Sequence, residues 1–378
     1  MKKGILAWVR SVDPILFFSM AFLSLVSILT IFGGMENFGR SKLIMQCAMT
    51  LAGVVVLFLI ANVDYRFFVD RLWIFFLVAS VLLLAITLVF GNSGQNIETA
   101  NKSWLRIPGI GISIQPSEFV KITFLCTFSK HIDMVKDRIN RPATVLALLG
   151  HAGLIVGLIL LSGDLGVALV YMGIIAVRLF CAGLSVWYFL AVALVLVLAF
   201  PLLWELLQPY QRERILFGFR PELDPDNVGR QALLSRETLA GGGFFGIGLF
   251  GRGRYETLPA SHTDFIFSTV CEKFGFVGGF LVVAALVILS LRLLWLGFRC
   301  RDMVGRLICS GIAAVIIIQT AENLWMCLGL VPVVGITLPF MSAGGSSVLA
   351  LYALMGLAHS VSAKERKKHF HSMGYRTR

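Results

Sequence analysis

Long apolar runs alternate with short polar connections along most of the chain, and this pattern predicts helices that cross a bilayer. Runs of spanning length occur roughly at residues 14–32, 44–63, 72–90, 116–131, 143–161, 165–179, 184–203, 265–298, 307–328 and 338–361. Because about 20 apolar residues span the hydrocarbon core, we expect an all-α membrane protein of about ten transmembrane helices. The stretch 204–263 then forms a long loop between the seventh and eighth helices.

Composition supports a membrane protein and excludes a soluble globule of this length. Of the 378 residues, 57% are hydrophobic and 14% are charged, and the mean hydropathy is +0.85. So little polar surface does not cover a soluble domain of this size. The first apolar run exceeds a signal-peptide core and lacks a small-residue cleavage site, so we expect it to be retained. A single polytopic domain over residues 1–378 is the simplest organisation.

Positive charge predicts the orientation of the chain. Lysine and arginine concentrate in alternate connections and in the basic tail 363–378, so both termini are expected to face the cytoplasm. The segments 91–115, 204–263 and 329–337 then lie on the outer side. The net charge of +12 is placed between apolar runs, which favours contact with anionic lipid over nucleic acid. The seven cysteines stand singly in apolar contexts, which is typical of buried packing.

Asp264 stands where the long loop meets the eighth apolar run. An ionised group near hydrocarbon is retained only when it has an ion-pair or hydrogen-bond partner, is hydrated or serves a function. Partial desolvation raises the pKa of a carboxylate toward that of a useful base. The alternative is helix capping, in which the side chain accepts backbone hydrogen bonds in the first turn. Glu272 lies roughly 80° from Asp264 around the axis of a helix. The two carboxylates can therefore line one cavity or face apart.

The fourth apolar run opens with charged residues in the sequence Gln115-Pro-Ser-Glu-Phe-Val-Lys121. Glu118 precedes Lys121 by three residues, a spacing that suits an ion pair on one helix face. Such a pair either ties helices together or positions a substrate. His151 and Asp164 flank the outer half of the fifth run and would suit a proton relay in a transporter, although a lone histidine is more often a hydrogen-bonded core residue.

The long loop combines arginines with glycines, which suits an anionic ligand. Cationic forks and exposed backbone amides bind pyrophosphate well, but glycines outside a strand–turn–helix context are a weak signal. The polar candidates of the loop are Gln211, Arg212, Arg214, Arg220, Arg230 and Arg236. Ser346 and Ser347 end the small-residue stretch that opens the tenth run, where close helix packing is the commoner explanation.

Four short motifs occur in one order along almost the whole chain. They are Ser-Trp-Leu followed by Ile-Gln-Pro-Ser-Glu-Phe within 103–119, Gly-Asp-Leu-Gly at 163–166, His-Thr-Asp-Phe-Ile-Phe at 262–267 and Leu-Pro-Phe-Met-Ser-Ala-Gly-Gly-Ser-Ser at 338–347. In this combination the chain resembles the SEDS family, which includes RodA, FtsW and SpoVE. The short amino-terminal tail and Val12–Pro14 look more like the elongation-type RodA, whereas Ser113 looks more like SpoVE or FtsW.

The resemblance implies a ten-helix peptidoglycan glycosyltransferase of the bacterial cell membrane. Such an enzyme polymerises lipid II, an undecaprenyl-pyrophosphate-linked disaccharide peptide, beside a class B penicillin-binding protein. Asp264 matches the essential loop aspartate of the family. The resemblance carries substrate-binding roles to other positions, which are Trp104, Gln115, Glu118, Lys121, Asp164, His262, Thr263, Glu272, Ser346 and Ser347. A divalent cation, Mg²⁺ or Mn²⁺, is an optional helper, and no protein-bound metal site is expected.

Some positions depart from the family pattern, and two other functions stay open. Gly163 replaces a proline; Ser103, Ala260, Lys273 and Ala343 replace an arginine, two glutamates and a tyrosine. Contacts around Asp264 are therefore less secure than Asp264 itself. A lipid II flippase would instead use the charged residues inside the membrane as a pathway. A scaffold without catalysis would use the long loop to bind partners.

Overall fold

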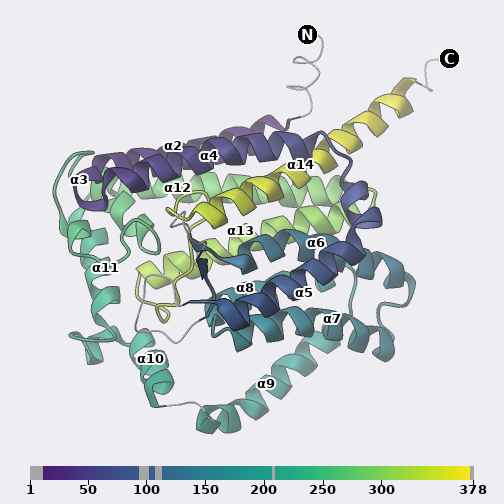
Figure 1. Cartoon of the computed structure of the whole chain (residues 1–378), viewed down its shortest axis with the longest axis horizontal. Coiled ribbons are helices and arrows are strands. Elements are labelled where there is room, and N and C mark those ends of the chain that lie inside the picture. The colour runs from purple at the N-terminus through teal and green to yellow at the C-terminus, as the bar shows by residue number, and fades with distance from the viewer. Residues whose placement is uncertain (1–11, 93–101, 107–112, 207–208, 375–378) are drawn as a thin grey trace.

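The computed structural model describes residues 12–92, 102–106, 113–206 and 209–374. Nearly all regular structure in this part of the chain is helical (Figure 1). The long helices are α2 (Pro14–Gly33), α4 (Arg40–Ala61), α5 (Trp73–Phe90), α6 (Pro116–Val135), α7 (Pro142–Leu161), α8 (Leu165–Cys181), α9 (Val186–Leu206), α12 (Ile266–Arg299), α13 (Met303–Cys327) and α14 (Gly345–Gly374).

These long helices match the predicted transmembrane runs. Among the described residues, seven helices are long and apolar enough to cross a membrane, namely α2, α4, α5, α7, α12, α13 and residues Gly345–Arg366 of α14. Two shorter apolar stretches lie in α8 and at Val186–Leu202 of α9. Helix α6 carries charged side chains, yet Glu118 and Lys121 are buried inside the bundle. The prediction of an all-α multi-pass membrane protein is confirmed.

Most of the long helices pack into one bundle. Helix α4 lies along α14, α12 packs against α2 and α13, and α13 packs against α8 and α6. Helix α9 lies apart from the other long helices (Figure 1), and most of its apolar side chains are exposed. Helix α2 begins and α14 ends at the same end of the bundle, where the backbone N–H of Asp13 donates to Nδ1 of His359 at 3.0 Å.

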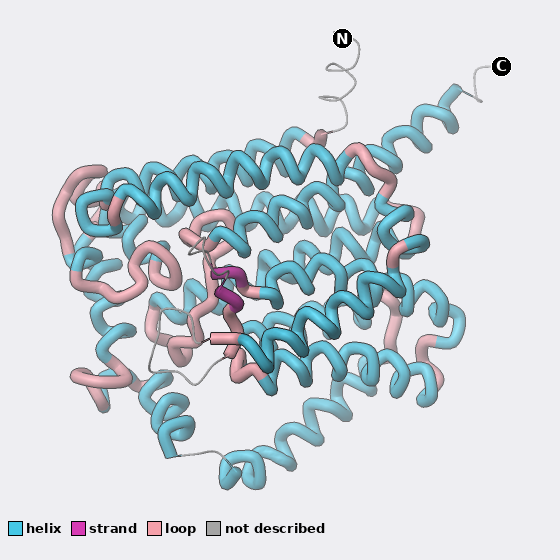
Figure 2. Tube along the Cα trace, viewed as in Figure 1, coloured by secondary structure: helices cyan, strands magenta, loops and turns pink. Residues whose placement is uncertain are grey.

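Shorter elements gather at the opposite end (Figure 2). The segment between α9 and α12 contains α10 (Pro209–Phe219), α11 (Arg230–Gly241) and two 3-10 turns, η3 (Pro221–Leu223) and η4 (Arg254–Glu256). Helix α3 (Met35–Phe38) joins α2 to α4. Strands β1 (Leu105–Arg106) and β2 (Ser113–Ile114) pair antiparallel, with Leu105 opposite Ile114. Two further short elements do not belong to this group, because η1 (Phe67–Arg71) follows α4 and η2 (Lys136–Arg138) follows α6.

The tenth helix begins later than the sequence predicts. Helix α14 starts at Gly345, and residues 338–344 before it form turns. Phe340 adopts a positive φ of 62°, and the Ser342 hydroxyl accepts a hydrogen bond from the N–H of Leu338 at 2.7 Å. The backbone of this apolar segment therefore forms hydrogen bonds in a loop and not in a first helical turn. The predicted start of the tenth helix at residue 338 is wrong.

Helix α12 is one long helix with a kink. Gly275 has a φ of 68° inside it, and a Cβ at Gly275 would approach the carbonyl oxygen of Phe244 at 2.3 Å. The kink thus lets the chain between α11 and α12 fold back onto α12 in close backbone contact. That returning chain leads into the loop that carries Asp264.

Candidate active site

A tight turn presents Asp264 just before α12. The carbonyl oxygen of Ala260 accepts hydrogen bonds from the N–H groups of Thr263 and Phe265 at 3.0 and 3.1 Å. Helix α12 begins at Ile266, and its N-cap is Phe265, without a side-chain capping bond. The side chain of Asp264 therefore does not cap the helix, and the capping alternative is not adopted.

The turn is fixed to two other segments through its backbone. Ser342 Oγ donates to the carbonyl oxygen of Thr263 at 2.7 Å. The N–H of Ala343 donates to the carbonyl oxygen of His262 at 3.0 Å. From α13, Asn323 Nδ2 donates to the carbonyl oxygen of Asp264 at 2.6 Å and to that of Ile336 at 2.7 Å. These bonds hold the main chain of Asp264 and do not involve its carboxylate.

Asp264 is partly buried as a residue. A Cβ built on Gly335 would lie 3.4 Å from Oδ2 of Asp264, so a larger side chain there would crowd the carboxylate. Burial raises the pKa of Asp264 to about 6, while the neighbouring Thr263 hydroxyl lowers it. A carboxylate that titrates close to neutral pH has the basicity expected of a general base.

A second polar cluster joins three elements. Gln115, before α6, donates from Nε2 to Oδ2 of Asp164 at 2.9 Å, and its N–H donates to Ser346 Oγ of α14 at 3.2 Å. Oδ1 of Asp164 accepts the N–H of Val167 at 3.1 Å and so caps α8. Burial raises the pKa of Asp164, against the lowering effect of its bonds from Val167 and Gln115.

The predicted ion pair of α6 is present. Lys121 Nζ donates to Oε1 of Glu118 at 2.7 Å, and the two side chains are 1% and 3% exposed. Asp164 lies within electrostatic reach of both. The structure therefore brings Gln115, Glu118, Lys121 and Asp164 together, although they come from separate predicted motifs.

The segment between α13 and α14 connects this cluster to Asp264. Gly335 lies beside the Asp264 carboxylate, and a Cβ on Gly166 would meet the side chain of Ile336 at 2.7 Å. The hydroxyl of Thr337 shares a hydrogen bond with that of Ser347 at 3.1 Å. The segment 335–337 thus contacts both the first turn of α8 and the side chain of Asp264.

Two predicted substrate-binding residues lie in different surroundings. Trp104 exchanges backbone hydrogen bonds with Asn92 at 2.8 and 3.1 Å, after the end of α5. His262 packs its ring on Phe38 with a centroid distance of 5.3 Å, and burial lowers its pKa to about 4. The imidazole is therefore neutral at pH 7 and faces α3, while its carbonyl oxygen helps to fix the turn.

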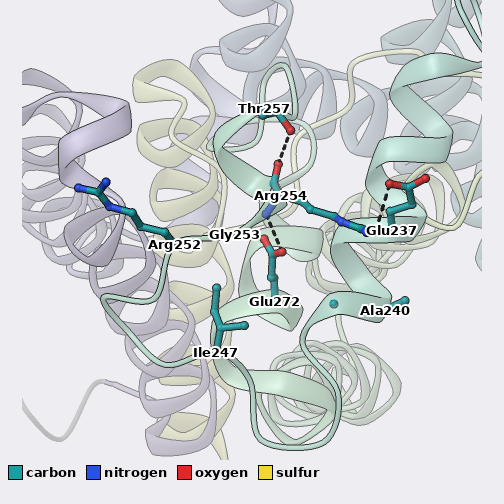
Figure 3. A pocket seen from close by; sticks show the side chains of 9 residues that line it. Glu237, Ala240, Ile247, Arg252, Gly253, Arg254, Thr257 and Glu272 are labelled. Carbon is teal, nitrogen blue, oxygen red and sulfur yellow. Dashed lines mark hydrogen bonds and ion pairs between the residues drawn. The ribbon is translucent and has the colours of Figure 1, made fainter.

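Glu272 lines a groove on the loop side of α12 (Figure 3). Its Oε1 and Oε2 accept the N–H groups of Arg254 and Tyr255 at 2.7 and 2.8 Å. The groove has a volume of about 620 Å³, and Arg252, Glu237 and Thr257 also line it, whereas Asp264 does not. Glu272 therefore anchors the loop, and the wall of this groove does not include Asp264.

The arginines of the long loop have varied settings. The guanidinium of Arg236 donates to the carbonyl oxygens of Leu328 and Gly329 at 2.6 and 3.0 Å and pairs with Glu222. Arg212 donates to the carbonyl oxygen of Glu205 at 2.7 Å. The side chains of the predicted Gln211 and Arg214 lie outside the described residues. Arg236 thus fastens α11 to the end of α13.

No group of three His, Cys, Asp or Glu side chains converges as a metal site in the part of the chain that the structure describes. Mg²⁺ is usually held by one or two carboxylates together with substrate phosphates. The described residues do not form a protein cage for such an ion.

Comparison with known proteins places the chain in a family. A family model for FtsW, RodA and SpoVE, described as cell cycle protein, matches residues 10–367. The chain belongs to the FtsW, RodA and SpoVE family.

Several members of this family are similar over most of their length. A probable peptidoglycan glycosyltransferase FtsW of Trichlorobacter lovleyi is 33% identical over 324 residues, which cover 84% of this chain and 82% of the relative. Stage V sporulation protein E of Bacillus subtilis is 33% identical over 83% of this chain and 85% of the relative. Peptidoglycan glycosyltransferase MrdB of Escherichia coli K12 is 32% identical over 82% of each.

Solved structures of the family have the same fold. A chain in a structure described as a peptidoglycan synthase complex, which coordinates polymerization and crosslinking, has a TM-score of 0.81 at 31% identity and covers 93% of this chain and 98% of its own. Rod shape determining protein RodA of Thermus thermophilus has a TM-score of 0.68 at 27% identity, covering 94% of this chain and 97% of its own. The likeness to these two structures supports the all-α multi-pass membrane fold.

Two residues of this family member were missed by sequence reasoning. Asn323 holds the backbone of Asp264 and Ile336, and Ser342 bonds Thr263. Asn323 was detectable, because an amide inside the ninth apolar run requires a polar partner. The role of Ser342 carried no signal, since small residues there equally suit helix packing.

Proposed function

We propose that this protein is a peptidoglycan glycosyltransferase that polymerises lipid II into glycan strands, with Asp264 as the general base. The observation that carries the proposal is a carboxylate with a pKa of about 6 whose main chain is held by Asn323 and Ser342. The names of the FtsW and MrdB relatives support the activity. Within the described chain this carboxylate accepts no backbone N–H, which supports the assignment of the base.

In the proposed reaction, Asp264 takes the proton from the 4-hydroxyl of the acceptor sugar. The resulting oxygen nucleophile attacks the anomeric carbon of the donor sugar and forms the new glycosidic bond. The bond between that carbon and the pyrophosphate oxygen breaks, and undecaprenyl pyrophosphate leaves with the electron pair. Cationic side chains of the long loop would stabilise the leaving charge, and preorganised charge of this kind is usually the largest catalytic contribution.

The experiment is polymerisation of purified lipid II by the purified full chain. The wild-type protein is expected to make glycan polymer, and the Asp264→Ala variant is expected to make none while it keeps the same thermal unfolding midpoint. Polymer from the Asp264→Ala protein at the wild-type rate would contradict the assignment of the base. Translocation of lipid II across vesicles without polymer would favour the flippase. Normal growth supported by the same variant would favour the scaffold.

Partner and placement complete the proposal. We place the protein in the bacterial cell membrane with both termini in the cytoplasm and a class B penicillin-binding protein as its partner. The fold shared with a chain of a peptidoglycan synthase complex supports such a partner. A divalent cation brought in by the substrate stays a prediction, which loss of polymer on chelation with EDTA would test.

The cellular process is proposed to be elongation. The FtsW, SpoVE and MrdB relatives have similar identities to this chain, so they do not separate the processes. Depletion of an elongation enzyme should give round cells. Filaments would assign the protein to division, and a defect confined to spores would assign it to sporulation.

A further inference from the structure

The groove on the loop side of α12 is crossed by an ion pair (Figure 3). Its volume of about 620 Å³ falls within the range of ligand-binding pockets. Arg254 reaches across the groove and pairs with Glu237 of α11, with 3.1 Å between Nη1 and Oε2. The two side chains are 57% and 54% exposed. Because exposed ion pairs contribute little to stability, a ligand can separate this pair without unfolding the loop.

An extended backbone segment forms part of the groove wall. Arg252 and Gly253 line the groove, and Gly253 has extended dihedral angles, with φ −155° and ψ −168°. In the part of the chain that the structure describes, the N–H groups of these two residues donate to no backbone carbonyl. A Cβ on Gly253 would approach Oε1 of Glu272 at 2.6 Å, so glycine lets the segment lie directly against that side chain. The wall therefore presents main-chain donors to the groove.

The chemistry of the wall favours a peptide that bears a carboxylate. Glu237 shows that the guanidinium of Arg254 takes a carboxylate in this groove, and the two groups match in bidentate geometry. Main-chain donors suit the carbonyl groups of an extended peptide. The hydroxyl groups of a neutral sugar would leave Arg254 without an anion. Pyrophosphate carries more negative charge than one carboxylate, so Glu237 and Glu272 in the wall would repel it more strongly.

We propose that this groove binds the peptide portion of lipid II, with Arg254 exchanging Glu237 for a carboxylate of that peptide. The inference rests on the proposed function and names the part of the substrate that the groove takes. One substrate molecule is long enough to contact both the groove and the base. Glu272 lies two turns beyond Asp264 in the chain, roughly 12 Å at about 1.5 Å per helical residue. About four extended peptide residues cover that length.

The test measures binding of two water-soluble probes to the purified full chain. One probe is the disaccharide peptide without lipid or pyrophosphate, and the other is the same disaccharide without its peptide. The wild-type protein should bind the first probe more tightly. Arg254→Gln should weaken binding of the disaccharide peptide about ten-fold, the effect of one lost hydrogen bond to a charged group, and should leave binding of the second probe unchanged. Ala240→Trp, which fills the groove without removing a charge, should have the same effect.

The Glu237→Gln variant separates ligand binding from a purely structural ion pair. If the pair only fastens the loop to α11, loss of either partner should change binding alike. In the proposed exchange Glu237 competes with the ligand, so Glu237→Gln should tighten binding of the disaccharide peptide about two- to three-fold. All three substituted positions are exposed, so the variants should keep the wild-type unfolding midpoint. The matched control is Arg301→Gln, an exposed arginine between α12 and α13, which should alter neither affinity.

The outcomes separate this inference from the proposed function. Equal affinity of the wild-type protein for the two probes would overturn the peptide site, as would equal weakening by Arg254→Gln and Glu237→Gln. Variants that lose only their association with a penicillin-binding protein, with both probe affinities unchanged, would assign the groove to that protein and would also overturn the inference. A wild-type protein that makes no polymer would refute the proposed function, yet the binding measurements would still judge the groove.

Discussion

Two carboxylates near the start of α12 have opposite surroundings. Glu272 is fully inside the helix, and both of its oxygens accept backbone N–H groups from Arg254 and Tyr255. Asp264 precedes the helix, and within the described chain its carboxylate accepts no backbone amide. Its carbonyl oxygen is bonded instead, by Asn323. The protein therefore uses the side chain of Glu272 to hold backbone, and it uses backbone contacts to hold Asp264.

This difference distinguishes a structural acid from a chemical one. Hydrogen bonds to a carboxylate favour its charged form and occupy the lone pairs that a substrate would need. Asp164 resembles Glu272 in this respect, because it caps α8 and also accepts from Gln115. Burial is the largest cause of the raised pKa of both Asp264 and Asp164, but of the two carboxylates only that of Asp164 accepts a backbone N–H within the described chain.

The largest expected effect concerns activity. Asp264→Asn should lower kcat for lipid II polymerisation by at least about 1,000-fold, because the amide cannot accept the proton, and general bases contribute about 100- to 10,000-fold. Its thermal midpoint should match or exceed that of the wild type. Glu272→Gln, assayed beside it, should keep kcat within about ten-fold in the folded fraction. Equal losses of kcat in the two variants would contradict the distinction between a catalytic Asp264 and a structural Glu272.

The next effect concerns stability. Glu272→Gln replaces one accepting oxygen by an NH₂ group that faces a backbone N–H, in a residue that is 2% exposed. The free energy of unfolding should fall by about 2 kcal/mol, since a buried group left without its partner costs about 1–3 kcal/mol. Thermal unfolding in detergent measures the change, with Glu36→Gln as a surface control. An unchanged midpoint would mean that the two bonds to Glu272 contribute little.

The pH dependence should report Asp264 directly. A base must be deprotonated, so kcat should fall about ten-fold per pH unit below the pKa of about 6 and level off above it. Stability should respond in the opposite sense. The folded pKa exceeds the ordinary aspartate value of 3.8, so this group favours folding at low pH, and its contribution is lost as pH rises through about 6. A kcat profile that is flat between pH 5 and 8 would exclude Asp264 as the base.

Helix positions were predictable because membrane thickness fixes the length of an apolar run. The Glu118 and Lys121 pair was predictable too, because helical geometry brings residues three apart together. The start of α14 was not predictable, because the sequence of residues 338–344 is as apolar as that of a membrane-spanning helix. Their turn conformation depends on bonds from Ser342 and Ala343 to the turn before α12, and such distant pairings leave no periodic signal.

The surroundings of each predicted site residue were less predictable than its identity. The sequence indicated both Asp264 and Glu272 as candidate site residues. Only the folded loop reveals that the N–H groups of Arg254 and Tyr255 donate to the carboxylate of Glu272. Arg178 shows the same limit. It is fully buried in α8 and bonds the carbonyl oxygen of Leu125 at 2.8 Å, a contact between two helices that no local pattern records.

A smaller effect should follow from loosening the backbone of Asp264 without touching its carboxylate. Asn323→Ala removes the donor that joins the carbonyl oxygens of Asp264 and Ile336. We expect kcat to fall about ten-fold with KM nearly unchanged, because one lost hydrogen bond corresponds to about 1–1.5 kcal/mol. The acid limb of kcat near pH 6 should persist, which distinguishes misplacement from loss of the base. Wild-type kcat would show that the turn holds Asp264 without α13.

The smallest effect tests the turn itself, at the one position where it is strained. Ala260 has a positive φ of 53°, a conformation that costs a residue with a Cβ about 1–2 kcal/mol, while glycine adopts it freely but loses about 0.5–1 kcal/mol of chain entropy on folding. Ala260→Gly should therefore raise the free energy of unfolding by up to about 1 kcal/mol. Activity should stay near wild type, because Thr263 and Phe265 still bond the carbonyl oxygen of residue 260. A large loss of kcat with normal stability would instead show that the strain helps to aim Asp264, and would make backbone conformation part of what separates it from Glu272.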